Sequence, residues 1–150
     1  MQEITLGGRT IPLLLTSFEL IEIQEAIGCT VAQLRDDVFG VTEEEEPGPD
    51  GKPKFHLLIA TDAMRMKKLG SLIRIIGNAG LDAQEEEPDL TDKWVLRNIK
   101  PGMVLPVAII VMTVINDAMR METLEMARKE GTGPVDVTIE EKNRKKEPRK

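Results

Sequence analysis

The stretch that most limits how this chain folds is the run "MVLPVAIIVMTVI" at residues 103–115, which carries no charged side chain. Apolar residues would fall on almost every side of a helix built from this run, and such a helix is expected to be buried on more than one side. Pro106 is compatible with it only in the first turn. The run is shorter than the roughly 20 residues that a membrane-spanning helix requires. From Asn116 onward the pattern becomes amphipathic, so we expect a buried helix near 103–129, the longest of the chain.

The helices that come earlier in the chain are marked by threonines suited to N-cap positions. Two of these threonines are followed three residues later by Glu or Gln, which is the capping-box pattern. The helix that contains "MKKLGSLIRIIG" is expected to stop at Asn78 to Gly80, because asparagine and glycine commonly end helices. The expected helix starts are at Thr16, Thr30, residue 57 or Thr61, and Thr91.

The chain opens with the pattern of a β-hairpin. The segments "EITL" and "TIPLLLT" flank "GGR", and Gly-Gly is a signal for a tight turn. Residues 40–53, "GVTEEEEPGPDGKP", predict a polar loop, because glutamates mixed with prolines and glycines cannot pack a core. The expected fold class is mainly α with a small N-terminal β-hairpin (α+β) and about five helices. We expect a single helical domain at 1–131 and a flexible, partly disordered tail at 132–150, which ends in "KNRKKEPRK".

Several missing motifs argue against an enzyme and against a cofactor or metal site. The chain has one cysteine, Cys29, and one histidine, His56, in unrelated segments, so neither a zinc site nor a catalytic Cys–His pair is expected. No glycine-rich phosphate-binding loop occurs. A single cysteine excludes an intramolecular disulfide and is typical of a reducing cytosol. The net charge of −6 argues against a general nucleic-acid surface. What remains is a protein that binds other proteins.

The five residues "DAMRM" occur twice, at 62–66 and at 117–121. An internal repeat would preserve the hydrophobic phase over a whole supersecondary unit. The two copies agree in phase for only a few residues, which favours a local coincidence of helix-forming residues. The Asp and Arg at i,i+3 are expected to form an exposed ion pair. The methionines are two positions apart and cannot share one line of a helix. In the first copy Met66 is therefore assigned to the packed stripe and Met64 flanks it. In the second copy Met119 is assigned to the line of the last helix and Met121 flanks that line.

Methionine is frequent in a chain that has no tyrosine, one tryptophan and three phenylalanines. One interpretation is that methionine fills an aromatic-poor core. The other is that Met64 and Met121, together with Met103, line a groove for an apolar helix of another protein. Methionine is flexible and polarizable, and it is common on surfaces that accept varied partners.

Three segments carry a resemblance to a known family. They are "ITLGGRTIPLLLTSFELIEIQEAIGCTVAQL", "MKKLGSLIRIIGNAGL" and "LTDKWVLRNIKPGMVLPVAIIVMTVINDAMRMETL". In content and order they resemble the tail assembly chaperones of long-tailed bacteriophages and related prophages, over most of residues 2–124. The acidic insertion at 43–50 and the basic tail do not match the family pattern.

The resemblance implies an assembly factor that binds and solubilises the long, helical, apolar tape-measure protein and recruits tail-tube subunits. Such a factor works in the host bacterial cytoplasm and is absent from the mature virion. In many phages a translational frameshift gives a minority of copies a second domain, so a frameshifted longer form of the chain is an expected partner. The family has no catalytic residues to carry over. Holding a long polymer in several copies would favour a homo-oligomer.

Two alternatives stay open. The first is a structural virion component, such as a tail-completion or connector protein. The second is a small regulatory protein that binds nucleic acid through the basic residues at 142–150.

Overall fold

The computed structural model describes residues 1–43, 51 and 55–120. The chain divides into two units, Met1–Ala118 and Met119–Lys150, and the elements described here all lie in the first. The predicted boundary at 131/132, the predicted tail and Met121 lie outside the described residues. The elements follow the order β1 (Glu3–Leu6), β2 (Arg9–Pro12), α1 (Ser17–Ile27), the 3-10 helix Val31–Gln33, the π-helix Arg35–Phe39, β3 (Val41–Glu43), β4 (Phe55–Leu57), the 3-10 helix Leu58–Thr61, α2 (Ala63–Ala83), α3 (Asp92–Arg97), the 3-10 helix Pro101–Met103 and α4 (Val104–Ala118).

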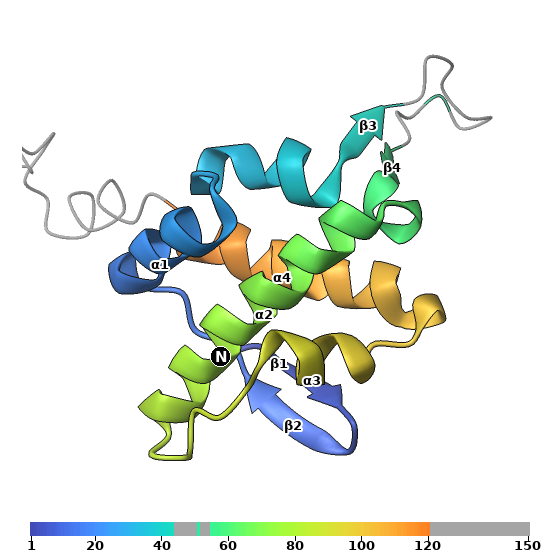
Figure 1. Ribbon diagram of the computed structural model, residues 1–150. Helices are drawn as coiled ribbons and strands as arrows, with labels where there is room; N and C mark the ends of the chain where they lie inside the picture. Colours follow the sequence, from blue (N-terminus) through green and yellow to red (C-terminus); the bar gives the residue numbers. More distant parts are fainter. Residues whose placement is uncertain (44–50, 52–54, 121–150) are drawn as a thin grey trace, which may run out of the picture. The chain divides into compact units, whose positions relative to one another are not determined.

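Helix α2 is the centre of this arrangement (Figure 1). It packs against α1 and α3, against strand β2, and against the short helices on either side of the β3–β4 hairpin. Its buried residues include Leu69, Leu72, Ile73 and Ile76, which follow helical spacing and lie at the middle of the core. The predicted mainly α fold with a small N-terminal hairpin is confirmed.

The N-terminal hairpin forms as its sequence predicts. Strands β1 and β2 pair antiparallel, with Ile4 opposite Ile11 and Leu6 opposite Arg9. Gly7 and Gly8 both have positive φ, at 56° and 77°, which suits a two-residue turn and is costly for other residues. The alternation of the strands points Ile4, Leu6 and Ile11 into the core.

Most of the predicted helix starts are also confirmed. Thr16 and Thr30 form capping boxes, and Thr91 accepts a hydrogen bond from the backbone N–H of Trp94. The start of α2 differs from the expectation of residue 57 or Thr61. Asp62 is the N-cap, because its carboxylate accepts from the backbone N–H groups of the first turn.

The predicted end of α2 is wrong, and its glycines explain the difference. The helix continues past Gly80 to Ala83. A Cβ on Gly80 would lie 2.0 Å from the carbonyl oxygen of Pro12, so glycine is required there for close approach of the hairpin. Gly70 similarly leaves room for Leu96 of α3. These glycines make space for neighbouring elements and do not end the helix.

The prediction of the longest helix near 103–129 is wrong in both length and rank. Helix α4 spans Val104–Ala118, and α2 is longer among the described residues. Met119 lies in a turn, and residues 121–129 lie outside the described part. Asn116 and Asp117 are weak helix formers, and a carboxylate near the C-terminus opposes the helix dipole. Both effects favour an end at this place.

Burial of α4 is also more one-sided than its composition predicts. The buried residues form a single stripe, whereas Leu105 is 42% exposed and Ile109 is 56% exposed. Residues 101–118 are long and apolar enough to resemble a membrane span by composition, with a mean hydropathy of 1.7, and one third of them are buried. Core helices of soluble proteins pass the same criterion. The buried stripe consists of Val104, Val107, Ala108, Val111, Val114 and Ile115.

A second hairpin occurs where a polar loop was predicted. Strands β3 and β4 pair antiparallel, with Val41 opposite Leu57 and Thr42 opposite His56. The prediction of a loop over 40–53 is therefore wrong for residues 41–43. Each strand has only three residues, which is shorter than the alternating runs that identify a strand from sequence. Residues 44–50 and 52–54 lie outside the described part.

Candidate functional site: an apolar groove beside helix α4

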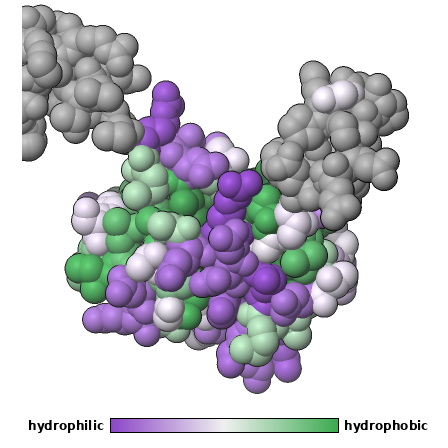
Figure 2. Space-filling model, turned by 90° about the horizontal axis from the view of Figure 1, so that it is seen from above, coloured by the Kyte–Doolittle hydropathy of each residue, from purple (hydrophilic) through white to green (hydrophobic). Residues whose placement is uncertain are grey.

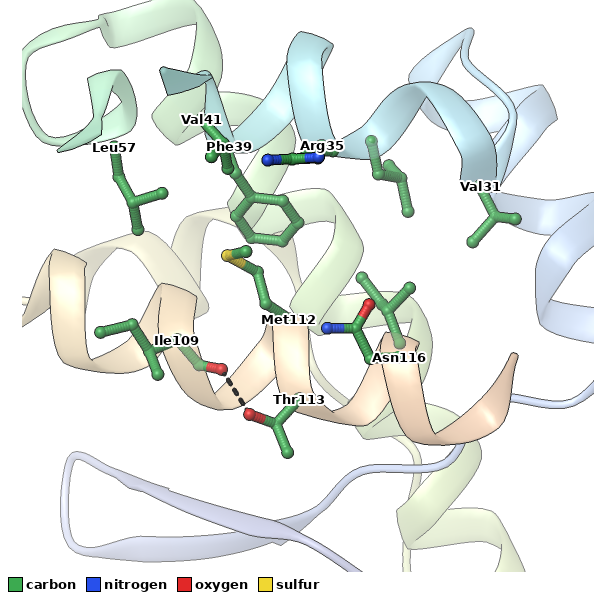
Figure 3. Close-up of a pocket in the computed structure, with 11 residues that line it drawn as sticks. Val31, Arg35, Phe39, Val41, Leu57, Ile109, Met112, Thr113 and Asn116 are labelled. Atoms are coloured by element: carbon green, nitrogen blue, oxygen red, sulfur yellow. Dashed lines mark hydrogen bonds between the residues drawn. The ribbon is translucent and has the colours of Figure 1, made fainter. Parts of the chain in front are cut away.

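A largely apolar groove of about 580 Å³ lies between helix α4 and the segment 31–39, which comprises the two short helices after α1 (Figure 3). Its volume falls within the range typical of protein binding sites. Strands β3 and β4 each contribute one residue to the lining, Val41 and Leu57. The lining residues are Val31, Leu34, Arg35, Phe39, Val41, Leu57, Ile109, Met112, Thr113, Ile115 and Asn116.

One wall of the groove is held in place by local hydrogen bonds. The capping box fixes the start of the segment, where the backbone N–H of Thr30 donates to Gln33 at 2.8 Å. The guanidinium of Arg65 in α2 donates to the carbonyl oxygen of Asp36. Gly40 follows with a φ of 62° and turns the chain into β3, in a space too close to Leu58 for a side chain. The wall is therefore anchored at both ends and in the middle.

The floor of the groove joins its two walls. Phe39 from the segment 31–39 and Met112 from α4 point toward one another (Figure 3). A thioether beside an aromatic ring is a favourable contact, and methionine adapts its shape to a neighbour. Phe39 is fully buried, whereas Met112 is only half-buried and remains accessible from the groove.

The wall formed by α4 presents apolar side chains to solvent. Ile109 lies at the groove, and Leu105 lies one turn earlier on the same side of the helix. The hydroxyl of Thr113 donates to the carbonyl oxygen of Ile109 at 2.9 Å, so its hydrogen-bonding capacity is used within the helix. The wall thus offers an uncharged surface two to three turns long.

Two polar side chains line the groove without being engaged elsewhere. The side chains of Arg35 and Asn116 make no hydrogen bond or ion pair with any residue in the part of the chain that the structure describes. Both are exposed. Figure 3 shows them on opposite walls, Arg35 above Phe39 and Asn116 directed into the groove.

The predicted partner-binding methionines do not form this groove. Met64 is 62% exposed in the first turn of α2, which agrees with its predicted flanking position, and Met66 packs against the core. Met103 is half-buried against the core. Neither Met64 nor Met103 lines the groove, and Met121 lies outside the described residues.

The residues that sequence reasoning missed are Ile109 and Met112. Their signal was present, because Leu105, Ile109, Met112 and Asn116 recur at helical spacing along a face beside the buried stripe. It was hidden because apolar residues occupy both sides of the helix.

The two copies of "DAMRM" occupy opposite ends of helices. In the first copy Asp62 caps α2 and pairs with Arg65, whose Nε lies 3.0 Å from the carboxylate. The predicted i,i+3 ion pair therefore forms there, but it is partly buried and not exposed as predicted. In the second copy Asp117 and Ala118 are the last residues of α4. One copy opens a helix and the other closes one, which supports coincidence over duplication.

A second apolar surface lies on α1. Phe18 is 66% exposed and Ile21 is 59% exposed, and they share one side of the helix with Glu22 and Glu25. Figure 2 shows hydrophobic patches on either side of a hydrophilic band on the uppermost face of the molecule. Exposed apolar patches of this kind commonly mark interaction sites.

Residues 1–43, 51 and 55–120 contain no cluster of metal ligands, and the one cysteine among them is buried. No group of three or more His, Cys, Asp or Glu residues there is placed to hold a metal ion. Cys29 is buried and follows directly after the glycine that caps α1. Burial raises the pKa of its thiol, Asp37 raises it further, and Lys68 opposes the shift. A thiol with a raised pKa is a poor nucleophile.

Comparison of the chain with known protein families, with curated proteins and with solved structures found no match.

Proposed function

We propose that this chain is a tail assembly chaperone that binds the tape-measure protein of a long-tailed phage and keeps it soluble in the host cytoplasm. The observation that carries the proposal is the accessible apolar groove between α4 and the segment 31–39. It agrees with the sequence resemblance, which predicts a binder of long apolar helices. On this proposal the chain acts by binding, without catalysis or a cofactor, and is absent from the mature virion.

The groove is suited to a helical partner. An amphipathic helix places apolar anchors at i, i+3, i+4 and i+7, and such anchors fill grooves lined by aliphatic side chains and methionine. Helix α4 contributes Ile109 to its wall of the groove and Met112 to the floor, and Leu105 continues the apolar wall by a further turn. A methionine in the floor allows successive, non-identical stretches of a tape-measure helix to be accommodated.

Recruitment of tail-tube subunits requires a surface outside this groove. The α1 stripe of Phe18 and Ile21 is the second exposed apolar surface, and we propose it for this contact. A frameshifted longer form of the chain would present the same α1 surface. Several copies bound along one tape-measure helix would form a homo-oligomer on that template.

The test is co-expression of the full chain with the tape-measure protein of the same genome. We expect the tape-measure protein to become soluble and to co-purify with the chain. The variant Ile109→Glu places a charge in the groove and should abolish this effect, whereas Ile21→Glu, at an equally exposed isoleucine, should preserve it. A tape-measure protein that stays insoluble, or that elutes alone, would refute the proposal.

A structural tail-completion or connector protein is the alternative, because exposed apolar surfaces also suit a permanent neighbour in a particle. Mass spectrometry of purified particles separates the two. A chaperone is absent or present in traces, and a structural component is present in stoichiometric amounts.

A further inference from the structure

We infer that the helix bound in the groove carries a carboxylate beside its apolar stripe, and that Arg35 recognises this carboxylate. The inference rests on the proposed function in one respect, namely that the occupant is a helix of a protein partner. Beyond that function, we infer which charge the bound helix carries and which residue of this chain recognises that charge.

Arg35 lies on the wall of the groove that the segment 31–39 forms. Among the described residues whose side chains line the groove it is the one that is charged, and helix α4 carries no charge between Val104 and Asn116. The neighbouring acids, Asp36 and Asp37, do not line the groove. Against these described residues, a helix lying in the groove would therefore meet one cation and an otherwise uncharged lining.

The guanidinium of Arg35 has hydrogen-bonding capacity that the described residues leave unused. The described part of the chain contains three ion pairs in which an arginine contacts an aspartate, and Arg35 belongs to none of them. Its guanidinium is planar and can donate two parallel hydrogen bonds to one carboxylate. Covering this group with an apolar partner would remove water from a charge without compensation.

Charge complementarity therefore selects among apolar helices. A glutamate or aspartate on the flank of the apolar stripe satisfies Arg35, and a lysine at the same position is repelled. On the opposite wall, Asn116 offers an amide that either donates or accepts, so it does not discriminate by charge. Arg35 is thus the specificity-determining residue of the groove, and the apolar contacts supply most of the affinity.

The experiment uses the full chain and two helical peptides with the same leucine-rich stripe, one with glutamates and the other with lysines on the flank. At low salt the wild-type chain should bind the glutamate peptide roughly three- to tenfold more tightly. In Arg35→Glu the preference should reverse, and in Arg35→Gln it should disappear. Added salt should weaken the preference more than the binding itself. The thermal midpoints of both variants show whether they fold. If Arg35→Glu does not fold, the result with Arg35→Gln decides the test.

The outcomes separate the two proposals. If both peptides bind equally and neither Arg35 variant changes the ratio, the inference is overturned while the groove remains a helix-binding site. If neither peptide binds, and Ile109→Glu also leaves capture of the tape-measure protein intact, the groove fails as the site and the inference fails with it.

Discussion

Gly80 illustrates what a single position can and cannot reveal in this sequence. A glycine after an asparagine is a common helix end, and that pattern predicted a stop at Asn78 to Gly80. The structure continues the helix through both, because the missing Cβ makes room for the backbone at Pro12. Side-chain caps such as Thr16 and Thr91 were predictable because their hydrogen bonds are local. A contact between residues 12 and 80 has no local signature.

We expect Gly80→Ala to lower the free energy of unfolding by roughly 1–3 kcal/mol, because the new Cβ meets a backbone atom that cannot move aside. This loss should appear even though alanine is the better helix former by about 1 kcal/mol. Chemical denaturation measures it. Gly102→Ala is the matched control, since nothing lies within 4 Å of its Cβ position, and its effect should be within about 0.5 kcal/mol. Equal effects at the two glycines would contradict the close approach.

Met64 and Met103 differ in burial, so substitutions at the two positions should differ in their effect on stability. Met64→Glu should leave the thermal midpoint nearly unchanged, because the side chain is largely in solvent. Met103→Glu should lower stability by roughly 1–3 kcal/mol, because it places a charge against the core. Thermal unfolding followed by circular dichroism compares the two variants. A strongly destabilised Met64→Glu would show that this position is packed.

At the scale of elements, the joint between α2 and α3 depends on Asp92, the first residue of α3. Its carboxylate accepts hydrogen bonds from Ser71, at 2.7 Å, and from Arg74, both on α2. Burial raises the pKa of Asp92, but the hydrogen bonds from Ser71 and Arg74, together with the charges of Arg74 and Lys67, outweigh that effect and lower the pKa. The sequence predicted α3 and its cap, but it did not predict that the first residue of α3 would bond to α2 residues 18 and 21 positions earlier in the chain.

The lowered pKa gives this joint a defined pH dependence. A carboxyl whose pKa is lower in the folded state stabilises the protein above its ordinary pKa of 3.8, and this stability is lost as pH falls through the folded value. We expect wild type to be more stable than Asp92→Asn near neutral pH, and the difference to shrink below about pH 4. Urea unfolding at a series of pH values measures the difference. If the difference in stability between wild type and Asp92→Asn does not change with pH, ionisation of Asp92 does not contribute to the stability of this contact.

At the scale of the whole molecule, the surfaces were harder to predict than the fold. The fold follows from caps, turns and periodicity, which a sequence displays directly. Helix α4 is apolar nearly all round, and this pattern is equally typical of a helix buried on two sides and of a helix buried on one side with a binding surface on the other. Only the packing of its neighbours shows that Ile109 and Leu105 remain exposed. The role assigned to Met64 remains a prediction, and the groove near Met112 is the stronger candidate.

The two exposed apolar surfaces should be functionally separable. We expect Ile109→Glu to reduce binding of the tape-measure protein at least tenfold and to leave tail-tube binding intact. Ile21→Glu should have the opposite effect, because α1 lies outside the groove. Each binding reaction is measured by titration with the purified partner. Loss of both activities in one variant, with its thermal midpoint unchanged, would contradict two separate sites.

The most direct test of the central claim is hydrogen–deuterium exchange of the full chain, alone and with a soluble helical segment of the tape-measure protein. If the groove is the binding site, slower exchange should be confined to peptides that cover residues 31–41 and 104–116, and Ile109→Glu should remove it. Protection confined to residues 17–27, or the same exchange with and without the segment, would contradict the account.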